Sequence, residues 1–268
     1  MVIVTKAAPA GAARAAAKPV RVDYSTLAGL AIAITGIFGA QLLDGGRLGA
    51  LLQGTAFLIV VAGTLGAVLV QTPPNVFARA LRMARWALLP PLREPERLIT
   101  RIVDWAGIVR KDGVLALEAR VRQVDDPFAK SGLQMLVDGF APDHLRDALD
   151  VELAARAEHQ RAAVRVWEAA GGYAPTIGII GAVLGLIHVM ENLADPARLG
   201  AGIAVAFVAT IYGLVLANLV FLPLAGKLRN VVAEENLLHE LTQEGLVGIA
   251  AGDHPRMIAA RLKGFLPR

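Results

Sequence analysis

Two long apolar runs, residues 171–190 and 199–223, constrain this chain more than any other feature. They read GGYAPTIGIIGAVLGLIHVM and LGAGIAVAFVATIYGLVLANLVFLP, and the polar bend ENLADPAR joins them. Each run has about the 20 residues that a helix needs to cross a hydrocarbon core. A bend this short allows only an antiparallel pair, and a lipid-exposed segment must satisfy its own backbone hydrogen bonds. The sequence therefore predicts a transmembrane helical hairpin.

Two further apolar runs, residues 26–43 and 48–70, predict a second hairpin near the N-terminus. Pro73 and Pro74 end it, because proline cannot continue a helix. The intervening segments are charge-rich and show helical spacing. We expect an all-α polytopic membrane protein with four transmembrane helices in two hairpins and a helical cytoplasmic domain inserted between spans two and three. The predicted segments are a flexible basic N-terminal tail (1–25), the first hairpin (26–70), the cytoplasmic domain (71–170), the second hairpin (171–223) and a cytoplasmic helical tail (224–268).

The distribution of charge orients these spans. Of the 27 Lys and Arg, only Arg47 and Arg198 lie in the two short bends, and the others precede span one, lie within or beside the large domain, or follow span four. Positive residues near span ends stay on the cytoplasmic side, so both termini and the large domain are predicted to be cytoplasmic. Basic and acidic residues nearly balance within the large domain, which argues against nucleic acid as a partner.

The polar segments give coarse helix predictions. Residues 75–89 form a basic amphipathic helix expected on the membrane surface, with Phe77, Leu81 and Trp86 sharing a face. Helices are also expected over 94–113, 114–124 and 130–140. The stretch from Ala141 to span three contains no breaker, so one long helix is expected to continue directly into the membrane. The tail predicts one longer and one short helix.

Small residues recur in the second hairpin, and they predict close helix contact there. Gly178, Gly181 and Gly185 follow one another at helical spacing, and the last two form a GxxxG pair. In lipid no hydrophobic force drives helices together, so small residues that allow close approach mark helix-packing faces.

The residues offer no enzyme chemistry. The chain has no cysteine, its five histidines are scattered, and no phosphate-binding loop or nucleophile–base set is present, so we predict no enzyme activity, cofactor or metal site. The spans also lack Asp, Glu, Lys and Arg between their ends, whereas proton relays need ionisable groups at that depth. Hydroxyls such as those of Thr176 and Thr210 remain. If ions cross here, the titrating carboxylate must come from another chain.

Residues 171–229, together with the stretches LDGGRLGALLQGTAFLIVVAGTLGAVLVQTP, RKDGVLALE and LQMLVDG, closely resemble the MotA family of bacterial flagellar stator subunits, within the MotA/TolQ/ExbB superfamily. The likeness is greatest to MotC-type members. This resemblance implies a homo-oligomeric ring in the bacterial inner membrane, in contact with membrane lipid. The ring surrounds a MotB-like single-span partner that carries the proton-binding Asp, and it acts on the rotor protein FliG.

The resemblance also assigns roles to particular residues. Pro175, in APTIG, and Pro223, in FLPLAGK, match the two prolines that couple ion passage to movement. Rotor-facing charges are expected at Arg110 and Glu118, with Lys111 as a further contact. The ion path is expected along Thr210, Ala182 and Thr176. Because sodium-driven members have Thr at the position of Ala182, proton coupling is expected.

Two alternatives remain open at this stage. One is a TolQ- or ExbB-like subunit that energises an outer-membrane system, although such relatives usually have three spans and an external N-terminus. The other is a membrane scaffold that conducts nothing.

Overall fold

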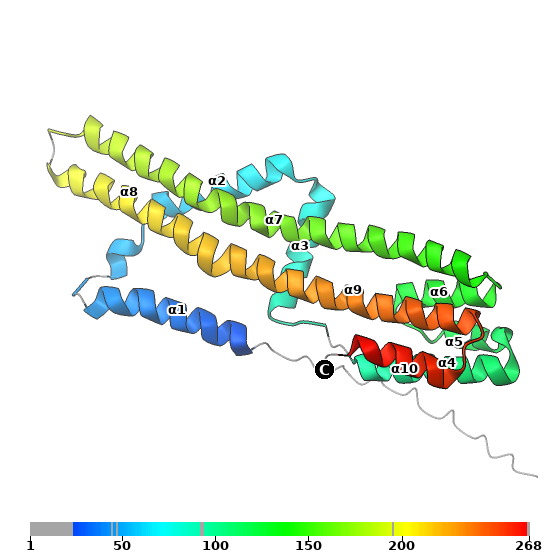
Figure 1. The fold of residues 1–268 in the computed structure, drawn as a ribbon. Helices are drawn as coiled ribbons and strands as arrows, with labels where there is room; N and C mark the ends of the chain where they lie inside the picture. Colours follow the sequence, from blue (N-terminus) through cyan, green and yellow to red (C-terminus); the bar gives the residue numbers. More distant parts are fainter. Residues whose placement is uncertain (1–23, 44, 47, 92–93, 195, 267–268) are drawn as a thin grey trace, which may run out of the picture.

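The computed structural model describes residues 24–43, 45–46, 48–91, 94–194 and 196–266. The N-terminal tail up to residue 23 and the bend residues Asp44, Arg47 and Asp195 lie outside the described residues. Two very long helical rods run antiparallel along the molecule (Figure 1). Shorter helices attach to these rods at both ends. No strand occurs in the described ranges, which confirms the all-α prediction.

The first rod is α7, Pro142–Glu191, a single helix of 50 residues. At about 1.5 Å per residue it is about 75 Å long. Pro142 begins it as expected, since a proline at the first helical position loses no helix hydrogen bond. The second rod consists of α8 (Pro196–Val215), a π-helical segment η4 (Leu216–Phe221) and α9 (Leu222–Ala250). The predicted boundaries at 170/171 and 223/224 therefore fall within continuous helices.

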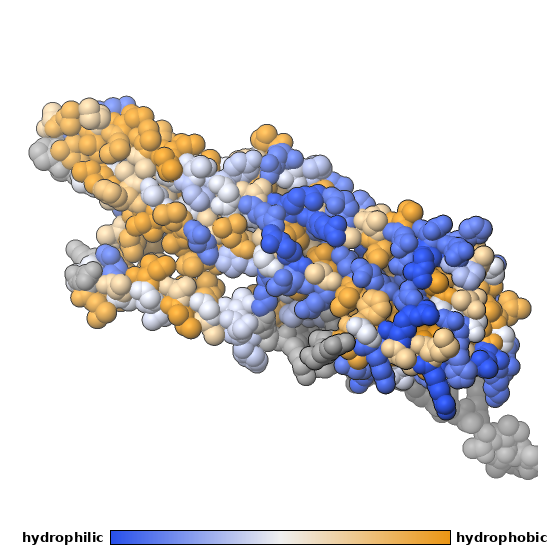
Figure 2. Space-filling view, viewed as in Figure 1, coloured by the Kyte–Doolittle hydropathy of each residue, from blue (hydrophilic) through white to orange (hydrophobic). Residues whose placement is uncertain are grey.

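Four helices among the described residues are long and apolar enough to cross a membrane. They are α1 (Tyr24–Leu43), α2 (Gly54–Gln71) with the preceding 3-10 turn η1 (Leu48–Leu51), and the apolar ends of the two rods. Figure 2 shows hydrophobic residues gathered over this end of the molecule and hydrophilic residues over the other. The four predicted spans are thus present as helices, and the chain is a membrane protein.

The helix that follows span two lies across the rods. α3 (Pro74–Ala84) and the turn η2 (Arg85–Ala87) bury Ala80 and Met83, and the Trp167 indole N–H of α7 donates to the Ala80 carbonyl over 3.2 Å. Leu81 stays half exposed, whereas Phe77 and Trp86 pack on the α7–α9 side. The face predicted from Phe77, Leu81 and Trp86 is therefore divided between protein contact and an open apolar side.

The polar end of the molecule is a helical layer around the ends of α7 and α9. It contains α4 (Pro95–Asp112), η3 (Val114–Leu117), α5 (Glu118–Val121), α6 (Pro127–Val137), α10 (Pro255–Leu262) and η5 (Lys263–Phe265). Its core includes fully buried Phe128, Leu133, Leu145, Leu149 and Leu246.

Two local predictions were wrong in this layer. Residues 114–124 form a 3-10 turn and a four-residue helix instead of one helix, beginning after Gly113, whose φ is +83°. α6 begins at Pro127, not at 130, because Asp126 caps it: its carboxylate accepts the Ala129 N–H over 3.0 Å. The sequence DDPF is therefore a helix start, with proline at the first helical position.

Candidate ion-path and coupling site

The backbones of α7 and α8 touch along a line of small residues. A Cβ atom added to Gly178 would lie 2.9 Å from the Ala209 carbonyl oxygen, and one added to Gly185 would lie 2.7 Å from the Ala206 nitrogen. A Cβ on Gly213 would lie 2.5 Å from the Ala174 carbonyl. Gly181 faces the same contact, against Ala209. The three predicted packing glycines thus all lie in the α7–α8 contact, where no larger side chain fits.

The helix α2 covers one flank of this pair. Ala56 and Val60 form a buried cluster with Val208 and Ala209 of α8. The Tyr212 hydroxyl donates to the Leu51 carbonyl and thereby ties α8 to the start of span two. These contacts fix which side of α8 faces α2.

Thr210 lies on the opposite flank. Successive helix residues are rotated by about 100°, so Thr210 points away from the side on which Val208 meets α2. Ala182, next to Gly181 on α7, borders the same flank, and both residues are half-buried. The Thr210 hydroxyl donates to its own helix, to the Ala206 carbonyl over 3.3 Å. Large apolar side chains stay exposed around this flank: Ile179, Leu186, Phe207 and Leu214.

Thr176 is not brought to this flank. It is exposed, and its hydroxyl donates to the Tyr173 carbonyl over 2.8 Å. Six residues separate it from Ala182, which rotates it by about 120° around α7. The structure therefore groups Thr210 with Ala182 and leaves Thr176 apart.

The two prolines lie on neighbouring rods near the same end of the spans. Pro175 lies within α7 without ending it, and Pro223 is the second residue of α9. Gly213 meets Ala174, and Gly171 meets Leu222, which places the two prolines at nearby levels. Pro223 also lies two residues after the end of the π segment, where the Leu222 N–H bonds to the Ala217 carbonyl five residues back.

The π segment was not predicted from the sequence. Pro223 lacks the N–H that would otherwise bond a carbonyl one turn earlier, and the Asn218 side chain donates to the Leu214 carbonyl over 2.9 Å. A proline preceded by an amide side chain within a span was the available signal. π-helical turns are rare and occur frequently at functional sites.

Aromatic residues link the spans to the helices below them. The Trp167 ring stacks on Phe221 of the π segment, with centroids 6.1 Å apart. The Tyr173 hydroxyl donates to the Gln71 amide oxygen over 2.9 Å, at the end of span two. Together with the Trp167 bond to Ala80, these contacts connect α7, α2, α3 and η4 at one level. Sequence reasoning did not single out these aromatic residues.

The predicted rotor-facing charges lie at the far end of α4. Arg110 and Lys111 are in its last turn, Glu118 begins α5, and all three are exposed. Within the part of the chain that the structure describes, none of them forms an ion pair. The turn at Gly113 holds them together at the polar end, remote from the spans (Figure 1).

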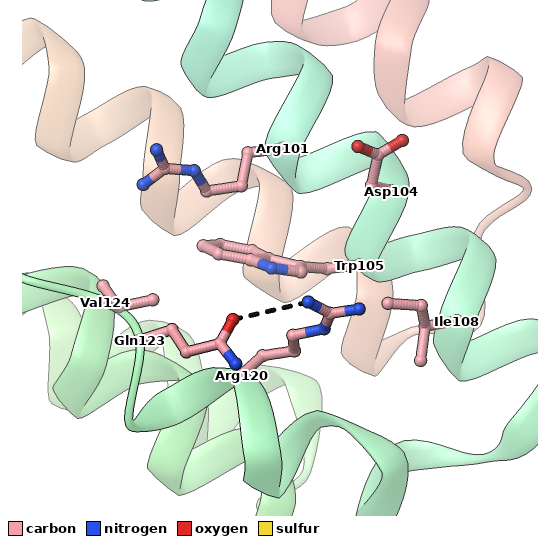
Figure 3. A pocket seen from close by; sticks show the side chains of 7 residues that line it. All are labelled: Arg101, Asp104, Trp105, Ile108, Arg120, Gln123 and Val124. Atoms are coloured by element: carbon pink, nitrogen blue, oxygen red, sulfur yellow. Dashed lines mark hydrogen bonds between the residues drawn. The ribbon is translucent and has the colours of Figure 1, made fainter. Parts of the chain in front are cut away.

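A polar cleft of about 300 Å³ lies beside this turn. In Figure 3 the Trp105 indole lies between the side chains of Arg101 and Arg120, and Arg120 donates to the Gln123 amide oxygen over 3.4 Å. Asp104 and Ile108 of α4 and Val124 complete the lining. The cleft adds charge to the same end of the molecule as Arg110 and Glu118.

A partly buried polar cluster connects α6, α7 and α9. His239 is 5% exposed, its Nε2 lies 3.1 Å from an Arg156 guanidinium nitrogen, and the Asp126 carboxylate lies 3.7 Å from both side chains. Partial burial raises the pKa of Asp126. The His239 hydrogen bond, the Ala129 N–H and the charges of His239 and Arg156 outweigh that effect, so its pKa lies below the ordinary value.

Comparison with known proteins agrees with this geometry. Residues 120–240 match the MotA/TolQ/ExbB proton channel family. Motility protein A of Bacillus subtilis is 34% identical over 247 residues, covering 91% of each chain. The chemotaxis protein PomA of Vibrio alginolyticus is 36% identical over 244 residues, covering 91% of this chain and 95% of PomA. This chain belongs to the MotA/TolQ/ExbB family.

Solved structures extend the likeness to the fold of this family member. The C. jejuni MotAB structure aligns with a TM-score of 0.86 at 30% identity, covering 92% of this chain and 96% of that one. The flagellar MotAB stator complex of Bacillus subtilis aligns with a TM-score of 0.82 at 34% identity, covering 91% and 96%. The resemblance to the MotA family is confirmed, and it covers nearly the whole chain.

Proposed function

We propose that this chain is a stator subunit of the bacterial flagellar motor, and that with a MotB-like partner it forms a proton channel that turns ion flow into torque on the rotor. The observation that carries the proposal is the match, over more than 90% of both chains, to a subunit of solved MotAB complexes. The composition of the spans supports a partner that supplies the proton-binding group, because the spans have no Asp, Glu, Lys or Arg between their ends. The proton-binding Asp would belong to the partner's single span.

A ring of copies around the partner accounts for the unpartnered surfaces of one chain. α1 has no buried residue, and its apolar side chains are exposed. In a membrane, lipid and neighbouring helices are the available contacts. We assign the partner's span to the flank of Thr210 and Ala182, since α2 covers the other flank.

The proposed coupling route follows the rods. Protonation of the partner's Asp changes the charge beside Thr210 and shifts the packing of α7 against α8. The close backbone contact prevents the helices from sliding independently, so movement concentrates where Pro175, Pro223 and the π segment weaken helix hydrogen bonding. The continuous helices then carry it to the exposed charges at Arg110, Lys111 and Glu118, which we assign to the rotor protein FliG.

Ion choice and orientation belong to the same proposal. Ala182 leaves no hydroxyl beside Thr210 that could help to replace the hydration shell of Na⁺, which favours protons. We place the chain in the bacterial inner membrane with both termini cytoplasmic, since basic residues cluster beside the polar ends of the spans.

The deciding experiment compares proton flux into liposomes that hold the chain alone, the chain with its MotB-like partner, and the complex with the partner's membrane Asp changed to Asn. We expect flux only in the second case, once the partner is in its active form. Steady proton flux through the chain alone would overturn the proposal that the partner supplies the proton-binding group. Binding of a short single-span subunit without a cell-wall-binding domain, together with an external N-terminus, would favour the TolQ- or ExbB-like alternative.

A further inference from the structure

A basic pocket of about 540 Å³ lies between α3–η2 and the middle of α7. It is separate from the α7–α8 flank and from the charges at the end of α4. Four arginines and one histidine line it, together with one carboxylate and one tryptophan. These residues are Arg79, Arg82, Arg85, Arg156, His159, Glu152 and Trp86.

The cations of this pocket exceed its anions. Glu152 is the one carboxylate in its lining. Arg79, Arg82 and Arg85 form no ion pair within the described ranges, although Arg79 is half-buried. Neighbouring guanidinium groups that outnumber the carboxylates beside them repel one another, and they bind phosphate through paired N–H groups. Among the four arginines, Arg156 also lies 3.7 Å from the Asp126 carboxylate, which is outside the pocket lining. The electrostatics of this pocket therefore favour an anionic ligand with several phosphate oxygens.

A second observation indicates that the ligand carries hydrogen-bond donors in addition to phosphate. Gln160 lines the same pocket, is 8% exposed, and its side-chain oxygen is buried without a hydrogen-bond partner. Buried polar atoms are nearly always satisfied, so each exception calls for a partner. An amide oxygen accepts only from N–H or O–H groups. A bare phosphate carries few such groups, whereas the base and ribose of a nucleotide carry several.

One part of the pocket lining, at Arg79, faces away from the exposed apolar side of α3. Leu81, Leu88 and Leu89 form the exposed apolar side of this segment. Two residues separate Arg79 from Leu81, so their side chains point about 160° apart, whereas Arg85 points within about 40° of Leu81 and forms the part of the pocket nearest that side. On α7, Gln160 precedes the start of the apolar run at Gly171 by eleven residues, or about 16 Å. A lipid headgroup at the membrane surface is thus a poorer fit than a soluble anion.

We propose that this pocket binds a nucleoside di- or triphosphate. The phosphates contact Arg79, Arg82 and Arg156, the ring stacks on Trp86, and an N–H or O–H of the nucleoside donates to Gln160. The pocket volume falls within the range of about 300–1,000 Å³ usual for small-molecule sites. Because the ligand bridges α3 and α7, its binding stabilises their contact beneath span two. The inference relies on the cytoplasmic orientation proposed above.

The test is calorimetric titration of the purified full-length chain in detergent with ATP, GTP and pyrophosphate. We expect saturable nucleotide binding that weakens at least tenfold in an Arg79→Ala/Arg82→Ala double variant. Arg122→Ala, which removes an exposed arginine outside the pocket, should bind as the wild type does. Gln160→Met should weaken nucleotide binding severalfold and leave pyrophosphate unaffected, because only the nucleoside reaches Gln160.

Several results would overturn this proposal. The first is an absence of saturable nucleotide binding. The second is full nucleotide binding by a double variant whose thermal stability matches that of the wild type. The third is tighter binding of short-chain phosphatidylglycerol than of ATP. The last result would assign the arginines to lipid. Nucleotide binding to single chains but not to the assembled ring would mean that a second copy of the chain covers the pocket. The arginines would then be assigned to the contact between copies. Motility is not measured, so a failure of this proposal can be distinguished from a failure of the proposed function.

Discussion

A single hydroxyl at Thr210 distinguishes the open flank of the α7–α8 pair from its apolar surroundings. Replacing Thr210 with Val keeps the side-chain volume and removes the hydroxyl, whose hydrogen bond runs only to its own helix. We expect swimming speed to fall strongly while the amount of protein in the membrane stays unchanged. Thr100→Val is the matched control, since the Thr100 hydroxyl makes the same kind of bond, to the Glu96 carbonyl, on exposed α4. If the two variants swim at the same speed, Thr210 is not part of the proposed ion path.

Asp126 combines two roles that substitutions can separate. Asp126→Asn keeps a good N-cap for α6 and removes the charge beside His239 and Arg156, whereas Asp126→Ala removes both. We expect Asp126→Ala to be the less stable variant, by about 1 kcal/mol for the lost cap. Thermal unfolding in detergent at neutral pH measures the difference. Equal stability of the two variants would mean that the cap contributes nothing.

The same residue predicts a pH dependence. The pKa of Asp126 is lowered in the folded chain, so its charge stabilises the fold above its ordinary pKa of 3.8. That contribution is lost as the pH falls through 3.8 and on through the folded-state pKa. The melting temperature of the wild type should exceed that of Asp126→Asn at pH 7, and the difference should shrink below pH 4. A difference that does not change with pH would contradict this assignment.

Among the helices, the α7–α8 contact depends on the absence of side chains. Gly185→Ala would place a Cβ atom 2.7 Å from the Ala206 nitrogen and 2.9 Å from the Gly202 carbonyl oxygen, so the helices must separate. We expect a loss of about 1–3 kcal/mol in stability, as for other overpacked sites. Gly172→Ala, on the same helix with open space around it, should be neutral or stabilising by up to about 1 kcal/mol. The melting temperatures of the two variants in detergent test this contrast.

The π segment before Pro223 predicts a separation between stability and activity. Pro223→Ala restores a backbone N–H, which can bond a carbonyl one turn earlier and favour a regular helix through 216–222. We expect thermal stability equal to or above that of the wild type, with reduced torque in tethered cells. Full torque in this variant would mean that Pro223 is compatible with its place in the helix but is not needed for torque.

On the scale of the whole molecule, the rods separate the proposed ion path from the proposed rotor contact. Reversing both charges, Arg110→Glu with Glu118→Lys, changes only exposed side chains. We expect motility to be lost or strongly reduced while co-purification with the partner is unaffected. Lys130→Glu, an exposed charge change on α6, is the control. Motility retained in the double variant would argue against rotor contact at this end.

The sequence by itself determined the four spans, the all-α class and the long unbroken helix of α7, because each depends on residues that are neighbours along the chain. The length of an apolar run determines whether it can span the membrane, and the absence of helix-breaking residues allows one long helix. It also determined the family. Local reasoning failed at 114–124 and at the start of α6, where Gly113 and the Asp126 cap outweighed helical spacing.

Tertiary structure alone decided which flank Thr210 occupies, that Thr176 lies elsewhere, and that Arg79 and Gln160 line one pocket. It also brought Asp126 to His239 across more than one hundred residues of chain. Such relations depend on how whole helices pack, and the packing follows from backbone contact at Gly178, Gly185 and Gly213. No periodicity within one helix contains that information, since the position of a side chain relative to another helix is fixed only when the two helices meet.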